Sequence, residues 1–401
     1  MTRDGARAWR RWTPHATFGE LALVVVAAGL LVGGGPVPDA VPAGTSEPAG
    51  SYRVAPSCPR APRGVGGLTV DMLNRLVSST DLPGWQAADI GASARLSDGR
   101  VVWVFGDTVR EATLTPRLVA NSMLVSSGTC MAQVSAPDDG PVIPDAAPGV
   151  VLWPMSVVAI EPTPAYAGRG VDDVVVVLCT RTRRGTEPMD FHNLGTSAAV
   201  FTVSAGQAPQ LRSVVELTGD SAARDRVDWG AASAVDGAWF YIFGTRWDTR
   251  SFGRELYVGR SPAANPADRR RWRFWDGTRW QRRADRAHPV LPARGGVSQT
   301  LSVDRVDGRW LAVSKRDGDL GDYVYTWDAP TPHGPWTARR AIAAPAGFDT
   351  GRLQYAPLAH PELPLANGKL LVSISRNTTD LERLLRRPEA GRPVFAEVER
   401  P

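Results

Sequence analysis

A repeated hairpin pattern is the feature that most constrains the fold of this chain. Five segments carry a turn sequence followed by a strand-like run: "SDGRVVWVFGDT" (97–108), "VDDVVVVLCTR" (171–181), "VDGAWFYIFGTR" (235–246), "VDGRWLAVSKRD" (306–317) and "ANGKLLVSISRN" (366–377). Another strand-like segment precedes each of them, such as "DIGASARL" (89–96) or "WGAASAV" (229–235). A tight Asp-Gly turn between two such runs indicates a β-hairpin.

The spacing of these hairpins indicates the architecture. Gly99 and Gly237 are 138 residues apart, or two units averaging 69, and the next intervals to Gly308 and Gly368 are 71 and 60 residues. Each unit has room for two further strands, so the sequence predicts an all-β, five-bladed β-propeller of four-stranded blades. The terminal "PVFAEV" (393–398) is a candidate for a strand that closes the ring. Two separate domains are the alternative for a chain of this length.

The N-terminal segment has the layout of an export signal. Arginines at positions 3, 7, 10 and 11 precede an apolar run at 21–32, and small residues follow. We therefore expect residues 1–43 to be a signal peptide or N-terminal membrane anchor, 44–66 a Pro/Gly-rich linker, and 67–401 the propeller. Since Glu20 is the sole charge in 17–38, anchoring stays an alternative to cleavage. The expected location is secreted or held in the cell envelope.

Cysteine usage agrees with export. The three cysteines follow the signal-like segment and would meet an oxidising compartment, where they allow one bridge and one remaining thiol. Cys179 ends the apolar run "VVVVLC" and is expected to be a buried thiol, which leaves Cys58 and Cys130 as the predicted disulfide. The 46 basic residues are spread along the chain, so a nucleic-acid partner is not indicated. We expect a monomer.

Three acids are the catalytic candidates. In a propeller, the innermost strands line a central funnel, and their ends face one another. Asp89 begins the inner strand of blade one and Asp107 ends the next strand, so the two should be neighbours at one rim. Asp228 begins the inner strand of blade three. Paired carboxylates are what glycosidic hydrolysis requires; the alternative is that these residues form turns or cap strands.

Further residues are candidates for binding a sugar polymer. Aromatic rings at the rim would provide flat apolar surfaces, and polar groups of blade five would contact hydroxyls. These substrate-binding candidates are Trp153, Trp229, Tyr355, His360, Glu362, Arg376 and Asn377. No cofactor is predicted. The acids of "RDGDLGD" (316–322) do not match the twelve-residue calcium loop, and an ordinary acidic loop is favoured, with a structural Ca²⁺ left open.

The segments "ADIGAS…DGRVVWVFGDT", "VDWGAASAVDGAWFYIFGTR" and "YAPLAHPEL…GKLLVSISRN" resemble the bacterial propeller domain of glycoside hydrolase family 183. The resemblance extends over roughly residues 66–400. It implies an endo-D-arabinanase that acts on cell-wall arabinan, with Asp89 and Asp107 as the catalytic acids. The chain departs from the family pattern at Val109, where an aromatic residue often follows FGDT, and in blade two, which lacks the Asp-Gly turn.

Two functions are therefore compared. The first is an exported glycoside hydrolase that cleaves arabinofuranosyl linkages of a cell-envelope polysaccharide. The second is a non-catalytic propeller that binds cell-wall glycan or an envelope protein. Acids at two equivalent strand starts and one strand end favour the enzyme, because a pure binding protein has no need for facing carboxylates.

Overall fold

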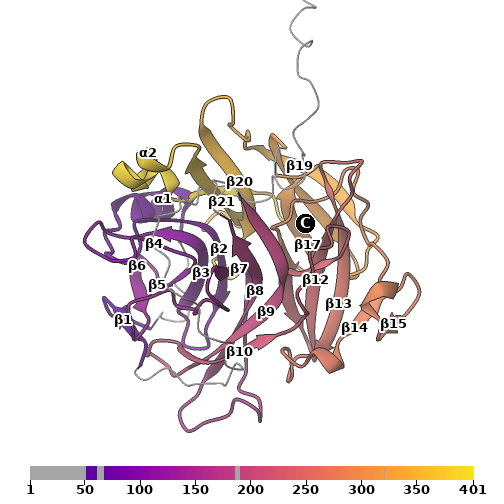
Figure 1. Ribbon diagram of the computed structural model, residues 1–401, viewed down its shortest axis with the longest axis horizontal. Coiled ribbons are helices and arrows are strands. Elements are labelled where there is room, and N and C mark those ends of the chain that lie inside the picture. Colours follow the sequence, from indigo (N-terminus) through magenta and orange to yellow (C-terminus); the bar gives the residue numbers. More distant parts are fainter. Residues whose placement is uncertain (1–50, 61–66, 186–189, 320) are drawn as a thin grey trace, which may run out of the picture.

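Five antiparallel sheets follow one another in chain order, from indigo to yellow in Figure 1. The computed structural model describes residues 51–60, 67–185, 190–319 and 321–401. Together the sheets form an all-β, five-bladed propeller, so the predicted fold class is confirmed. The predicted signal or anchor segment, 1–43, lies outside the described residues, as do 44–50 and 61–66 of the predicted linker.

The blades differ in size. Blade one contains β1 (Arg53–Ala55), β2 (Ala87–Arg95), β3 (Val101–Val109), β4 (Leu118–Val119), β5 (Ser122–Ser127) and β6 (Cys130–Ser135). Blade two contains β7 (Val150–Ile160), β8 (Asp173–Arg184), β9 (Phe191–Val203) and β10 (Gln210–Glu216). Blade three contains β11 (Asp228–Asp236), β12 (Trp239–Trp247), β13 (Arg254–Pro262), β14 (Arg273–Trp275) and β15 (Trp280–Gln281).

Blade four contains β16 (Ser302–Val306), β17 (Arg309–Lys315), β18 (Tyr323–Ala329) and β19 (Thr337–Ala343), and blade five contains β20 (Arg352–Ala359), β21 (Leu370–Thr378) and β22 (Val394–Val398). The helices are α1 (Val70–Ser79) and α2 (Leu381–Arg386), with 3₁₀ turns η1 (Arg269–Arg271), η2 (Ala284–Arg286) and η3 (Pro388–Gly391). Among the described residues, blades two and four have the predicted four strands and the other three blades do not. Within the described ranges, no helix combines the length and hydrophobicity needed to cross a bilayer.

The first strands of the sheets form the wall of the funnel. β2 contacts β7 and β20, β11 contacts β7 and β16, and β16 contacts β20, which closes a ring of five inner strands. Apolar side chains fill the spaces between neighbouring blades, for example Leu178 with Trp229 between blades two and three. The runs of Val in β8 suit a strand that is buried on both faces.

The C-terminal strand does not close the ring by completing another blade. The segment predicted for that role is β22, the outer strand of blade five, and it pairs with β21. Blades one and five meet through β2 and β20, and also through α1, which packs against β22 with two hydrogen bonds between Asn74 and the backbone of Phe395, of 3.0 and 2.8 Å. The predicted disulfide between Cys58 and Cys130 is present, and Cys179 is buried outside any disulfide.

Candidate active site

The backbone of β2 is irregular around Ile90, next to Asp89, at one end of the funnel. The pairing of β2 with β3 shifts register on both sides of Ile90, and Ile90 and Gly91 have positive φ angles of 68° and 74°. Bulges of this kind change the direction of a side chain and are frequent beside active sites. The carboxylate of Asp89 lies so close to Gly106 on β3 that a Cβ at Gly106 would overlap Asp89 Oδ1. Only glycine therefore fits before Asp107.

Asp89 is buried and accepts a hydrogen bond from blade five. Asp89 is only 3% exposed. The hydroxyl of Tyr355 donates to Asp89 Oδ2 at 2.8 Å, and Asn377 Nδ2 donates to the Tyr355 oxygen at 3.3 Å. Burial, followed by the neighbouring charge of Asp107, raises the pKa of Asp89 to about 7. Asp89 is thus a carboxyl group that retains a proton near neutral pH.

Asp107 is contacted by side chains of blade two, whereas Asp89 is contacted by blade five. Trp153 Nε1 donates to Asp107 Oδ1 at 2.8 Å, and the Arg184 guanidinium forms an ion pair with the same oxygen. Burial raises the pKa of Asp107 to about 6, although Arg184 and the Trp153 hydrogen bond both act to lower it. Asp145 also affects Asp107, since its charge acts to raise that pKa. The adjacent cation makes Asp107 the member of the pair that ionises first.

Each acid keeps one buried oxygen without a protein partner. Among the described residues, neither Asp89 Oδ1 nor Asp107 Oδ2 has a hydrogen-bond partner. Leaving a buried charged oxygen unpaired is costly, so such groups in a native structure call for an explanation. A substrate that accepts a proton from one acid and presents a reacting carbon or water to the other would use both oxygens.

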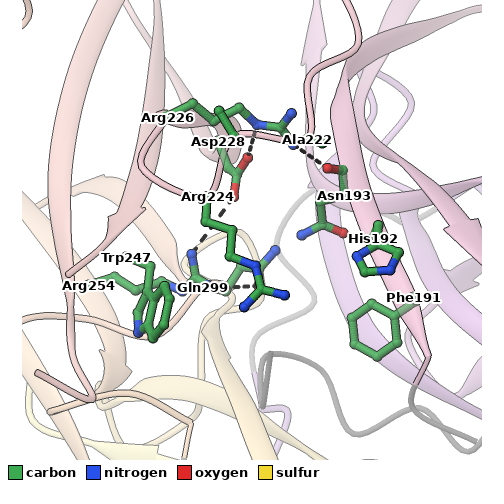
Figure 2. Close-up of a pocket in the computed structure, with 11 residues that line it drawn as sticks. Phe191, His192, Asn193, Ala222, Arg224, Arg226, Asp228, Trp247, Arg254 and Gln299 are labelled. Carbon is green, nitrogen blue, oxygen red and sulfur yellow. Dashed lines mark hydrogen bonds and ion pairs between the residues drawn. The ribbon is translucent and has the colours of Figure 1, made fainter. Parts of the chain in front are cut away.

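Asp228 lies in a different environment. It forms ion pairs with Arg226 at 2.9 Å and Arg254 at 3.8 Å, and its side chain keeps 20% exposure. Figure 2 shows it at the edge of a pocket, here called the arginine pocket. The pocket is lined by Phe191, His192, Asn193, Ala222, Ala223, Arg224, Arg226, Asp228, Trp247, Arg254 and Gln299. Asp228 is therefore held by two arginines in the wall of this pocket.

The aromatic candidates do not present open ring faces. Trp153 and Tyr355 are each 2% exposed, and their polar atoms hold Asp107 and Asp89 respectively. Trp229 is 4% exposed and packs against Phe274, with ring centroids 4.7 Å apart. The expectation of flat sugar-binding surfaces at these three positions is corrected: two of them orient the acids and the third belongs to the core.

His360 and Glu362 lie at the other end of the inner strands. Tyr355 is near the start of β20 whereas His360 follows its end, a separation on the order of 15 Å along an extended strand. His360 is fully buried, and its two ring nitrogens lie 2.5 Å from Ser93 Oγ and 2.8 Å from Ser373 Oγ. Ser93 also donates to Glu362. These two candidates thus form a polar cluster away from the paired acids.

Arg376 is also turned away from the acids. Its Nε donates to the Arg392 carbonyl at 2.7 Å, and the guanidinium also reaches the Glu389 carbonyl. It therefore fastens the segment that follows α2 to β21. Its neighbour Asn377 contacts the site through Tyr355, because side chains alternate along a strand.

Two residues beside the paired acids, Arg184 and Gly106, were not predicted from the sequence. Arg184 ends the second strand of blade two, the place that Asp107 occupies in blade one, and comparison of strand ends across the blades would have identified it. Gly106 could have been recognised as a position where another backbone or side chain approaches closely. Within the described part of the chain, no group of three or more His, Cys, Asp and Glu side chains is arranged to hold a metal ion.

A solved structure with a similar fold supports the propeller. A Bacteroides ovatus ATCC 8483 protein named "putative hydrolase" is 16% identical, with a TM-score of 0.63, and the alignment covers 84% of this chain and 92% of that one. A family 43 arabinoxylan arabinofuranohydrolase from Bacillus subtilis is 10% identical (TM-score 0.48, 80% and 67% covered). The catalytic domain of a family 62 α-L-arabinofuranosidase from Coprinopsis cinerea is 12% identical (TM-score 0.45, 87% and 97% covered).

No curated protein matches the sequence. A family model, however, matches residues 73–400, a range that runs from α1 to the end of blade five and includes both buried acids. The chain belongs to the family described as a domain of unknown function, DUF5005.

Proposed function

We propose that this chain is an exported glycoside hydrolase that cleaves arabinofuranosyl linkages within a cell-envelope polysaccharide. The observation that carries the proposal is the pair of buried carboxyl groups, Asp89 and Asp107, which adjacent strands bring to one end of the funnel with one oxygen of each unpaired among the described residues. Glycosidic hydrolysis needs two such groups, one protonated and one ionised.

The different surroundings of the two acids support distinct roles. Asp89, with a pKa raised to about 7, is the general acid that protonates the leaving glycosidic oxygen. Asp107, beside Arg184 and with a pKa raised to about 6, is the carboxylate that attacks the sugar carbon or activates water. These two reactions differ in the anomeric configuration of the first product, which an NMR time course determines.

A polymeric substrate is supported by two recesses that share part of their lining. Phe191 in the wall of the arginine pocket packs against Trp153, the hydrogen-bond partner of Asp107, with ring centroids 5.1 Å apart. A second recess shares Arg226 and Asp228 with the arginine pocket and is lined by residues of blades two and three. A chain bound along this path would extend beyond the cleaved bond, as internal cleavage requires.

The choice of arabinose and of an exported location has other support. Arabinofuranose follows from the resemblance of the DIG, FGDT, WG and SRN segments to glycoside hydrolase family 183. Export is supported by the signal-like residues 1–43 and by the Cys58–Cys130 disulfide, because disulfides persist in oxidising compartments.

The test is incubation of the purified chain with D-arabinan, followed by analysis of the released oligosaccharides. We expect fragments of intermediate length from an early stage, since internal cleavage releases few single sugars at first. A folded wild-type chain that releases nothing from several arabinans, but binds them in calorimetry, would instead identify a glycan-binding propeller.

A further inference from the structure

The arginine pocket carries more positive than negative charge. Among its described lining residues, three arginines face a single acid, Asp228. Arg226 and Arg254 form ion pairs with this acid. The pocket thus has an excess of cations, and its Phe191 packs against Trp153, the hydrogen-bond partner of Asp107.

The arginines are not equivalent. Arg226 is used by the protein, because it donates to Asp228 at 2.9 Å and to the backbone carbonyls of Leu194 and Asn193 at 2.5 Å each. Arg254 donates to Gln299 Oε1 at 3.1 Å in addition to its ion pair. Arg224 is exposed, and its side chain extends into the pocket between Asp228 and Gln299 (Figure 2). Its guanidinium is the group presented to a ligand.

The other side chains define what such a ligand must be. Trp247 and Phe191 provide apolar surface, and Asn193 and Gln299 provide amide groups, a combination that suits a sugar ring with hydroxyls. A guanidinium presents two parallel N–H donors that match the oxygens of a carboxylate or phosphate. Neutral sugars offer no partner for that charge.

We propose that the arginine pocket is a subsite for an oxyanion-bearing sugar of the polymer, one that carries a carboxylate or phosphate substituent recognised by Arg224. This inference rests on the proposed function for the identity of the polymer. The subsite lies next to the cleaved position rather than on it, because Phe191 and Trp153 separate it from Asp107. Substituted regions of the polymer would therefore be bound in preference to unsubstituted ones.

The experiment compares three forms of one arabinan: neutral, lightly carboxymethylated, and lightly phosphorylated. Calorimetry at fixed ionic strength gives the affinity of the full Asp107→Asn chain for each, with and without Arg224→Gln. We expect roughly 10-fold tighter binding of at least one anionic form, since charge-assisted hydrogen bonds are about twice as strong as neutral ones. Arg224→Gln should abolish this preference. The carboxymethyl and phosphoryl arms tell which oxyanion fits better.

Arg386→Gln is the matched control, because Arg386 is an exposed arginine on α2, in blade five, and its ion pair is with Glu382. It should retain the preference, which separates the pocket from general attraction to a basic protein. Equal affinity for all three polymers, or a preference that survives Arg224→Gln, would overturn the inference. Turnover by the wild-type chain is scored separately: no cleavage of any form counts against the proposed function, whereas the binding result still decides the subsite.

Discussion

Blades one and three contain nearly the same hairpin and use it differently. "DIGAS" pairs with "VFGDT" in blade one, and "DWGAAS" pairs with "IFGTR" in blade three. In blade one, Asp89 and Asp107 are buried together. In blade three, Thr245 takes the place of Asp107, and Asp228 is paired with two arginines. The strand position brings an acid to the funnel end, and the neighbouring side chains decide whether it lies beside a second carboxyl group or beside arginines.

Removing the acids should sharpen this contrast most. Asp89→Asn and Asp107→Asn should each lower kcat on arabinan by about 10³-fold, because proton transfer by a positioned group contributes roughly 10²–10⁴-fold. Asp228→Asn should change kcat by less than about 10-fold, because Asp228 lies beside two arginines rather than beside a second carboxyl group. Steady-state kinetics with circular dichroism as a folding control measures both. An Asp228 variant as impaired as Asp89→Asn would contradict the distinction between the blades.

Gly106→Ala probes the close approach that blade one requires. The new Cβ would overlap Asp89 Oδ1 and displace the carboxylate, so we expect a fall in kcat of about 10²-fold, as misplacement of a reacting group by an ångström can cause. Gly168→Ala, on the loop between β7 and β8, is the control, because a Cβ there meets only Val171 Cγ2 within 4 Å, at 3.2 Å. Full activity of the Gly106 variant would show that Asp89 does not depend on this contact.

Stability should respond in opposite directions in the two blades. Folding raises the pKa of Asp89 from 3.8 to about 7, so the folded state binds this proton more tightly than the unfolded state does. The folded protein therefore loses stability as the pH rises from about 4 to about 7. Asp89→Asn should therefore raise the melting temperature by several degrees at pH 8 and leave it unchanged at pH 4. Asp228→Asn removes two ion pairs and should lower it slightly at pH 8. Thermal unfolding at both pH values gives the comparison, and a destabilised Asp89 variant at pH 8 would argue against its burial cost.

The smallest effects are shifts in the pH–rate profile of kcat/KM. Because Arg184 lowers the pKa of Asp107, Arg184→Gln should move the acidic limb to higher pH by about one unit. Because the Tyr355 hydrogen bond lowers the pKa of Asp89, Tyr355→Phe should move the alkaline limb of the profile to higher pH and leave the acidic limb in place. If both variants moved the same limb, the assignment of acid and base roles would be wrong.

Much of the fold followed from local patterns. Turn residues mark four of the hairpins, and at Gly99, Gly237, Gly308 and Gly368 the φ angles are positive, as tight turns require. The proximity of Asp89 to Asp107 followed from hairpin geometry, since the start of one strand lies beside the end of its partner. The strand number of each blade did not follow, because outer strands depend on packing against the adjacent blade.

The roles of individual site residues were harder to predict because they depend on contacts between blades. Trp153 and Tyr355 belong to blades two and five, yet their polar atoms hold the acids of blade one. Arg376 and Asn377 are adjacent in sequence and point to different partners, since side chains alternate along a strand.

The sequence by itself determined five hairpin units, the disulfide pair and two acids at one hairpin end, because each depends on residues close along the chain or on simple counting. Only the tertiary structure decided which acids are buried, which are neutralised, and which aromatic rings are core. Those properties arise where blades meet. The charge of a side chain there depends on its burial and on nearby groups that can be distant in sequence, as Tyr355 is from Asp89.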